Sequence, residues 1–216
     1  MGMSATQTGQ PMRIAVLCSG GGSNLQAMLE AIDAGRIHGE VVLVLSNHAK
    51  SFALERARAR GIAAQFVSRK QAGSAEAYND ALLAQIRAAR ADLVVLAGYL
   101  CMVGPQIVAA YPLRILNIHP ALIPAFCGPG MYGERVHAAV LASGVKVSGA
   151  TVHFVDEQYD HGQIVMQRSV PVLDEDDVHA LAARVLAVEH QILPESVALL
   201  CAGKLRVDDR RVRVVQ

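Results

Sequence analysis

Two polar side chains stand near the end of an apolar run, in the segment Leu116-Asn117-Ile118-His119-Pro120. Residues two apart in an extended chain point to the same face of a sheet, so Asn117 and His119 should project side by side. Pro120 cannot donate to a sheet ladder, and the strand should end there. An imidazole carries protons near neutral pH, and an amide N–H stabilises an oxyanion. The alternative interpretation is that His119 lies at the end of the strand and has no function. The other segments of the chain distinguish between the two interpretations.

A glycine-rich turn, Ser19-Gly20-Gly21-Gly22-Ser23-Asn24, follows the first apolar run. Glycines let the backbone approach a phosphate, and the free N–H groups at a helix start point at it. A dinucleotide fingerprint would need a glycine where Leu25 stands, and a Walker A loop needs a lysine that the turn lacks. The turn therefore predicts a monophosphate site. The alternative is a tight turn in which Ser23 or Asn24 caps the helix.

The elements that position these segments alternate between apolar strands and amphipathic helices. Strands are predicted at 13–18, 41–45, 63–67, 92–96, 114–119, 147–155 and 164–172, with a closing hairpin at 204–207 and 212–215. Helices are predicted at 25–35, 52–60, 74–90, 105–110, 134–142 and 174–192, and Pro194 should kink or restart the last one. The alternation predicts an α/β fold with a Rossmann-like, mostly parallel twisted sheet flanked by helices. The later strands, with no helix between them, should extend that sheet in antiparallel fashion.

Composition narrows the classes of protein. In 216 residues, 52% are hydrophobic and 18% charged, which is ample for a core. The net charge of +1 argues against a nucleic-acid partner. No apolar run approaches the roughly 20 residues needed to span a bilayer. The spacing of the four cysteines is not that of a metal site; they are Cys18, Cys101, Cys127 and Cys201. We therefore expect reduced thiols and no bound metal. Together with the short apolar runs, this predicts a cytoplasmic protein without a membrane partner.

Four segments, taken together, resemble one family closely: glycinamide ribonucleotide transformylase, the folate-dependent formyltransferase of purine synthesis. The segments are 19–27, 96–99, 116–124 and 151–155, the last followed by Asp160 and Gly162. They occur in the family's order, and the resemblance extends from about residue 13 to 205. The second half resembles other formyl-tetrahydrofolate enzymes as well, whereas the Gly-Ser-Asn turn is typical of the glycinamide ribonucleotide branch.

The resemblance implies the site residues. The implied catalytic trio is Asn117, His119 and Asp160. The implied contacts to the nucleotide are Gly22, Ser23 and Asn24 for its phosphate and Glu189 for its glycinamide part. The implied folate-binding residues are Leu100, Cys101, Met102, Val103, Asn117, Asp156, Glu157, Gln158, Tyr159 and Asp160.

The implied reaction transfers the formyl group of 10-formyltetrahydrofolate, a cosubstrate, to the amine of glycinamide ribonucleotide in de novo purine (IMP) biosynthesis. In this scheme His119 handles the transferred proton. Asp160 would hold the imidazolium and favour its charged form. Asn117 would donate its amide N–H to the oxyanion of the tetrahedral intermediate. This scheme requires no metal and no covalent nucleophile. The oligomeric state is left undecided, and a homodimer is one of the alternatives.

Some residues depart from the family pattern or have a weaker case. Cys101 and Ala75 stand where the family often has arginine, and the second position contacts the folate tail in some members. The segment 126–136 is longer than usual and rich in glycine, which suggests a mobile flap. His153 is expected to be a packed support rather than a catalyst, and His137 to cap its helix or contact substrate. Cys127, with no paired base, is expected to be incidental.

The predicted organisation is a single formyltransferase domain at 13–207. It comprises a nucleotide-phosphate half, 13–112, and a folate and catalytic half, 113–207, with a flexible extension at 1–12 and a tail at 208–216. Three rival functions remain. A 10-formyltetrahydrofolate hydrolase would use the same trio with water as acceptor, but such enzymes usually carry an extra N-terminal domain. A non-catalytic phosphate-ligand sensor would explain only the glycine turn, and a nicotinamide dehydrogenase fits its sequence poorly.

Overall fold

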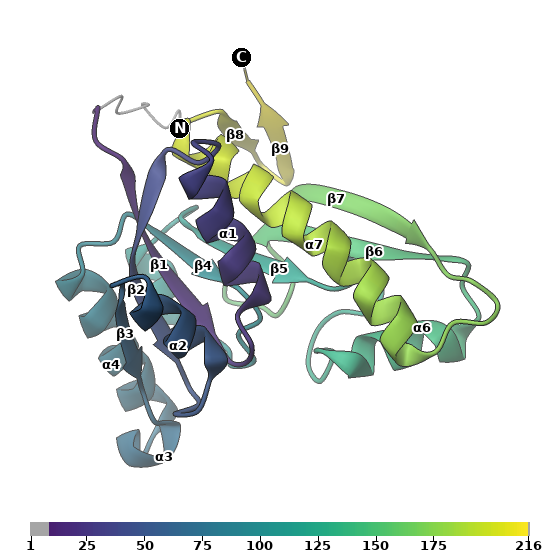
Figure 1. Cartoon of the computed structure of the whole chain (residues 1–216), viewed down its shortest axis with the longest axis horizontal. Coiled ribbons are helices and arrows are strands. Elements are labelled where there is room, and N and C mark those ends of the chain that lie inside the picture. Colours follow the sequence, from purple (N-terminus) through teal and green to yellow (C-terminus); the bar gives the residue numbers. More distant parts are fainter. Residues whose placement is uncertain (1–8, 216) are drawn as a thin grey trace.

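A seven-stranded sheet forms the centre of the protein (Figure 1). The computed structural model describes residues 9–215. The strands are β1 Met12–Cys18, β2 Gly39–Ser46, β3 Ala63–Phe66, β4 Leu93–Leu96, β5 Ile115–His119, β6 Val147–Phe154 and β7 Ile164–Pro171. They are ordered β3-β2-β1-β4-β5-β6-β7. The first five are parallel, and β6 and β7 are antiparallel to their neighbours, which confirms the predicted mixed sheet.

Helices cover both faces of this sheet. They are α1 Ser23–Asp33, α2 Phe52–Ala59, α3 Arg69–Ala72, α4 Ala75–Ala88, α5 Pro105–Ala110, α6 Glu134–Ser143 and α7 Val178–Cys201. Apolar side chains of α1, α2 and α7 pack into the core on one face, and those of α4 and α5 form the core on the other. Figure 1 shows α1 and α7 side by side. The sheet is therefore buried on both sides, as a parallel sheet requires.

Local sequence signals explain where several helices begin. The Ser74 hydroxyl accepts a hydrogen bond from the Ala77 N–H at the start of α4, and Asp177 does the same for the Ala180 N–H at the start of α7. These caps satisfy donors that a helix start leaves free. The short helix α3, which the sequence analysis missed, is capped in the same way by Ser68.

Pro194 does not end the last helix, and the prediction of a helix ending near 192 was wrong. The α7 helix continues to Cys201 with Pro194 inside it. Ile192, Leu193 and Val197 on either side of the proline are buried in the core. We infer that this packing outweighs the lost backbone hydrogen bond, because most helical stability in proteins comes from tertiary contacts.

The two chain ends differ from the central domain. The predicted hairpin forms as β8 Leu205–Asp208 and β9 Arg211–Val214, so β9 lies within the range 208–216 that the sequence assigned to a tail. Within the predicted extension 1–12, Met12 opens β1, and residues 1–8 lie outside the described part of the chain. None of the described helices is long and apolar enough to cross a membrane.

The strand order places the candidate site. The chain runs outward from β1 to β3 and then returns to β4 on the other side of β1. Such a reversal leaves a crevice at the carboxyl ends of the strands, where open α/β sheets bind ligands. The loops that follow β1, β4 and β5 all start at this edge, and they contain the glycine turn, residues 97–104 and residues 120–133.

Candidate active site

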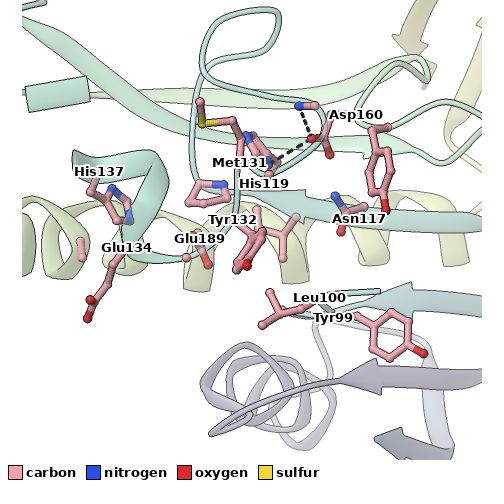
Figure 2. A pocket seen from close by; sticks show the side chains of 18 of the residues that line it. Tyr99, Leu100, Asn117, His119, Met131, Tyr132, Glu134, His137, Asp160 and Glu189 are labelled. Atoms are coloured by element: carbon pink, nitrogen blue, oxygen red, sulfur yellow. Dashed lines mark hydrogen bonds and ion pairs between the residues drawn. The ribbon is translucent and has the colours of Figure 1, made fainter. Parts of the chain in front are cut away.

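The implied catalytic trio comes together at the end of β5 (Figure 2). The main cavity is lined by Asn117 and His119, two apart on that strand, and by Asp160 from the turn between β6 and β7. Asp160 Oδ2 lies 3.7 Å from His119 Nδ1, and His119 is only 4% exposed. Asp160 has a φ of +51°, which non-glycine residues rarely adopt, so the turn is held in an unusual conformation beside the histidine.

His119 has a defined tautomer. Its Nε2 lies 2.9 Å from the Phe126 carbonyl oxygen, which can only accept, so Nε2 carries the proton. Burial lowers the pKa of His119, while Asp160 and the Phe126 carbonyl act in the opposite direction. The expectation that Asp160 favours the charged form is right in direction, but burial outweighs it. His119 is therefore neutral at pH 7 and ready to accept a proton.

Asp160 stays ionised although it is largely buried. Burial raises its pKa, but the neighbouring His153 and His119 and a hydrogen bond from the Gly128 N–H together hold the pKa below its ordinary value. The Gly128 N–H lies 2.8 Å from Oδ2, and His153 Nε2 lies 3.6 Å from Oδ1. An ionised carboxylate beside an imidazole stabilises the positively charged imidazolium that forms when the imidazole gains a proton.

His153 supports Asn117, as the sequence predicted for a packed histidine. It is 1% exposed, and its Nδ1 donates to the Phe154 carbonyl across 2.7 Å. In this tautomer Nε2 offers a lone pair, and Asn117 Nδ2 donates to it across 3.0 Å. The orientation of the Asn117 amide is thereby fixed, and its second N–H is left for a ligand.

The segment 126–136, which we call the flap, covers the cavity. Its backbone supplies the Phe126 carbonyl to His119 and the Gly128 N–H to Asp160, and Met131 and Tyr132 line the cavity wall. Figure 2 shows Met131 next to His119. The flap thus belongs to the site, and its mobility stays a prediction.

The glycine turn requires a glycine at one position. Gly22 has a φ of +71°, and a Cβ there would lie 2.7 Å from Ala53 Cβ, so only glycine fits. Gly22 precedes α1 without any side-chain cap, so the alternative in which Ser23 or Asn24 caps the helix was wrong. The first N–H groups of α1 have no partner within the helix and can bind an anion.

Asn24 links this turn to the cavity. Its Nδ2 donates to Glu189 Oε2 across 2.7 Å, and Glu189 lines the cavity from α7. Burial raises the pKa of Glu189 to about 7, although the Asn24 bond opposes that shift. The glutamate is poised to lose its proton when a cationic group binds. The turn that the sequence predicts to bind phosphate and the implied glycinamide contact are thus directly connected.

Two adjoining cavities share Asn117 and Asp160 of the trio. The larger has a volume of about 380 Å³ and the smaller about 70 Å³. Both are lined by Tyr99, Cys101, Asn117, Tyr159 and Asp160. Of the implied folate residues, Met102, Val103, Asp156 and Gln158 line only the smaller cavity and Leu100 only the larger. Glu157 lines neither cavity, so it is the one implied folate residue that the fold does not bring to them.

The sequence analysis missed a positioning role for Thr151. This residue pairs with His119 across β5 and β6. Its hydroxyl donates to the Ala121 carbonyl across 2.6 Å and accepts from the Ile123 N–H at 3.1 Å. It therefore fixes the chain directly after His119. The sequence contained a signal for this role. Thr151 lies two residues before His153 in an extended strand, so the two side chains must lie on the same face of the sheet.

The two residues that depart from the family pattern, Cys101 and Ala75, lie in different surroundings. The sulfur of Cys101 accepts a hydrogen bond from Asn47 Nδ2 at 3.1 Å and lies 3.9 Å from Arg69 Nη1. Arg69, from the unpredicted helix α3, thus brings a guanidinium close to the position where the family often has arginine. Ala75 begins α4 and is exposed.

Cys127 has the properties of an ordinary thiol. Burial and the charge of Asp160 raise its pKa, and its sulfur donates to the Pro124 carbonyl at 3.3 Å. A protonated thiol is a poor nucleophile. Within residues 9–215, no three His, Cys, Asp or Glu side chains gather in an arrangement that would hold a metal ion.

Comparison with known proteins gives the class. The sequence profile of the formyl transferase family matches residues 12–197, and the chain belongs to this family. The chloroplastic phosphoribosylglycinamide formyltransferase of Arabidopsis thaliana is 42% identical over 205 residues, which cover 94% of this chain and 70% of that protein. The phosphoribosylglycinamide formyltransferase of Escherichia coli K12 is 39% identical over 198 residues, covering 92% of this chain and 91% of that protein.

A solved structure agrees with this assignment. The crystal structure of glycinamide ribonucleotide transformylase 1 from Symbiobacterium toebii superposes with a TM-score of 0.92 at 44% identity, covering 100% of this chain and 99% of that one. The fold implied by the sequence resemblance is confirmed. The relatives from Arabidopsis thaliana and Escherichia coli, which match this chain over most of its length, are both phosphoribosylglycinamide formyltransferases.

Proposed function

We propose that this chain is a phosphoribosylglycinamide formyltransferase. It transfers the formyl group of 10-formyltetrahydrofolate to the amine of glycinamide ribonucleotide, giving formylglycinamide ribonucleotide and tetrahydrofolate in de novo purine (IMP) biosynthesis. The observation that carries this proposal is the convergence of two cavities on Asn117 and Asp160, with a phosphate-binding turn connected to one of them through Asn24 and Glu189. A donor in one cavity and an acceptor in the other would meet at the trio.

His119 moves the proton. The substrate amine attacks the formyl carbon, so a new N–C bond forms and the carbonyl oxygen becomes an oxyanion. The amine must then lose a proton, and the folate nitrogen must gain one as its bond to the formyl carbon breaks. His119 starts neutral and takes the proton, Asp160 stabilises the resulting imidazolium, and the proton is passed to the leaving nitrogen.

Asn117 stabilises the oxyanion with the N–H that His153 leaves unused. A donor held in place before the reaction contributes typically 10²–10³-fold in kcat. Burial of the site strengthens such an interaction because less water competes for the charge.

Glu189 and the glycine turn recognise the acceptor. The free N–H groups at the start of α1 would bind the phosphate, and Glu189 would bind the glycinamide part from α7. A hydrolase, which uses water as acceptor, has no need of this connected pair. The proposal also includes a cytoplasmic location, which cell fractionation tests. It includes a homodimeric assembly as well, which sedimentation of the purified full chain tests.

The test is formyl transfer by the purified chain, followed by the absorbance change as the folate loses its formyl group. Turnover that requires glycinamide ribonucleotide is the expected result. Equal turnover without the nucleotide would identify a hydrolase instead. No turnover in either case would favour a phosphate-ligand sensor.

A further inference from the structure

Arg56, on α2, contacts the glycine turn and has no part in the chemistry above. Its Nε donates to the Gly21 carbonyl across 2.9 Å, and its Nη1 donates to Gln26 Oε1 across 3.2 Å. The guanidinium also lies over the Phe52 ring, 4.8 Å from the ring centroid. Helix α2 packs beside α1, which begins directly after the turn (Figure 1). Three contacts therefore hold one long side chain against the turn that is expected to bind phosphate.

The preceding carbonyl of the turn is held by the start of the same helix. The Gly20 carbonyl accepts from the Ser51 hydroxyl at 2.7 Å and from the Ala53 N–H at 3.2 Å. Two successive carbonyls, those of Gly20 and Gly21, thus point towards α2 and its cap. Hydrogen bonds from α2 therefore set the orientation of two neighbouring peptide groups in the turn.

The direction of these carbonyls fixes the direction of two N–H groups. In a trans peptide, the C=O of one residue and the N–H of the next lie in one plane and point in opposite directions. The Gly21 N–H is therefore turned away from Ser51, and the Gly22 N–H is turned away from Arg56. Within residues 9–215, no backbone carbonyl accepts from either N–H. Successive N–H groups that point to one side form an anion-binding concavity, and this one opens on the side of the turn opposite to α2.

We propose that Arg56 is a positioning residue for the substrate phosphate, because its hydrogen bond to the Gly21 carbonyl directs the Gly22 N–H at that phosphate. This inference rests on the proposed function of the site. Arg56 acts through the peptide group between the two glycines and does not touch the nucleotide. Glycine adopts many backbone conformations, so a Gly-Gly peptide without this bond is free to rotate and to present its carbonyl oxygen to the anion.

The test replaces Arg56 with two uncharged side chains. Arg56→Gln places an N–H donor, Nε2, at the same number of bonds from the backbone as the arginine Nε, whereas Arg56→Met has no donor. We expect Arg56→Met to raise the KM for glycinamide ribonucleotide about 10-fold, the scale of one hydrogen bond to a charged group. Arg56→Gln should recover most of this loss. In both variants kcat at saturating nucleotide and the folate KM should be unchanged, because the trio keeps its contacts.

A matched control separates the hydrogen bond from the charge. Arg58→Met removes a positive charge from an exposed position on the same helix and should leave the nucleotide KM unchanged. If Arg56→Met does not fold, Arg56→Gln carries the test alone: the inference requires a nucleotide KM near that of the wild type. Isothermal titration with glycinamide ribonucleotide, which needs no turnover, should rank the Kd values of the variants in the same order.

Three results would overturn the inference. Equal rises in the nucleotide KM for Arg56→Met and Arg56→Gln would show that the charge of Arg56 binds the phosphate directly. An unchanged nucleotide KM in Arg56→Met, or a lower kcat without a change in KM, would show that Arg56 does not position the phosphate. A wild-type enzyme that fails to formylate glycinamide ribonucleotide at all would instead overturn the proposed function.

Discussion

The Asn117 amide is held by the His153 imidazole, with Nδ2 of the former 3.0 Å from Nε2 of the latter. His153 in turn is fixed by its own bond to the Phe154 carbonyl, 2.7 Å away. This chain of contacts runs from the backbone of β6 to the proposed oxyanion donor on β5. A side chain that is only 1% exposed therefore decides how the site presents its amide.

Replacing His153 should damage catalysis through Asn117. His153→Phe keeps the ring volume but removes the acceptor, so the amide is free to rotate. Misplacement of a catalytic group by about 1 Å costs up to about 10²-fold, and we expect a loss of kcat of that order with little change in either KM. His153→Gln, which retains an acceptor, should recover part of kcat. Steady-state kinetics of both variants make the comparison, and an unchanged kcat in His153→Phe would remove this role.

Removing the proposed catalytic side chains should affect turnover far more than binding. Asn117→Ala deletes the oxyanion donor, for which we expect a loss of about 10²–10³-fold in kcat. His119→Ala deletes the proton carrier, and general acid–base catalysis contributes typically 10²–10⁴-fold. Isothermal titration should find nucleotide binding little changed in both. Near-normal turnover in either variant would exclude that residue from the mechanism.

Glu189 should make the stability of the ligand-free protein depend on pH. Its pKa rises from 4.5 to about 7 on folding, so between these values the folded state holds a proton that the unfolded state has released. The stabilisation from this proton is present below pH 4.5 and lost as the pH rises through 7. The shift corresponds to about 3 kcal/mol.

A matched pair of variants tests this dependence. Glu189→Gln mimics the protonated form and should unfold at higher temperature than the wild type at pH 8 but not at pH 5. Glu55→Gln, at an exposed position on α2, should show no such difference. The nucleotide should bind Glu189→Gln more weakly. Parallel melting curves of wild type and Glu189→Gln at all pH values would show that Glu189 is not shifted.

Gly22 and Gly21 should tolerate alanine very differently. At Gly22 the left-handed φ costs roughly 1–2 kcal/mol for any other residue, and the new Cβ would lie 2.8 Å from Ala53 Cα. At Gly21 a Cβ meets nothing within 4 Å. We therefore expect Gly22→Ala to raise the KM for the nucleotide at least about 10-fold while the folate KM holds, and Gly21→Ala to have a small effect. Similar KM values for both variants would mean that the turn is not the phosphate site.

The sequence predicts best what depends on local periodicity. Asn117 and His119 share a face because strand side chains alternate, and that needed no tertiary information. Asp160 is different, because its place beside His119 depends on a turn with a φ of +51°, and only family resemblance implied it. The alternative in which Asn24 caps the helix was wrong, because its side chain bonds to Glu189, which is 165 residues further along the chain.

Two outcomes that depend on a balance of opposing energies could not be predicted from the sequence either. The pKa of His119 is lowered because burial outweighs a nearby carboxylate, and the extent of burial follows only from packing. Pro194 continues a helix that its own chemistry disfavours, because its neighbours are buried in the core. In both cases tertiary structure overrides a correct local rule.

The most direct test of the proposed function follows the formyl group itself. The donor would carry a ¹³C-labelled formyl group, and the products would be separated and weighed by mass spectrometry after incubation with glycinamide ribonucleotide and the purified chain. We predict that the label is recovered on the nucleotide amine, one label for each tetrahydrofolate formed. Recovery of the label as free formate, with the nucleotide unchanged, would contradict a transferase.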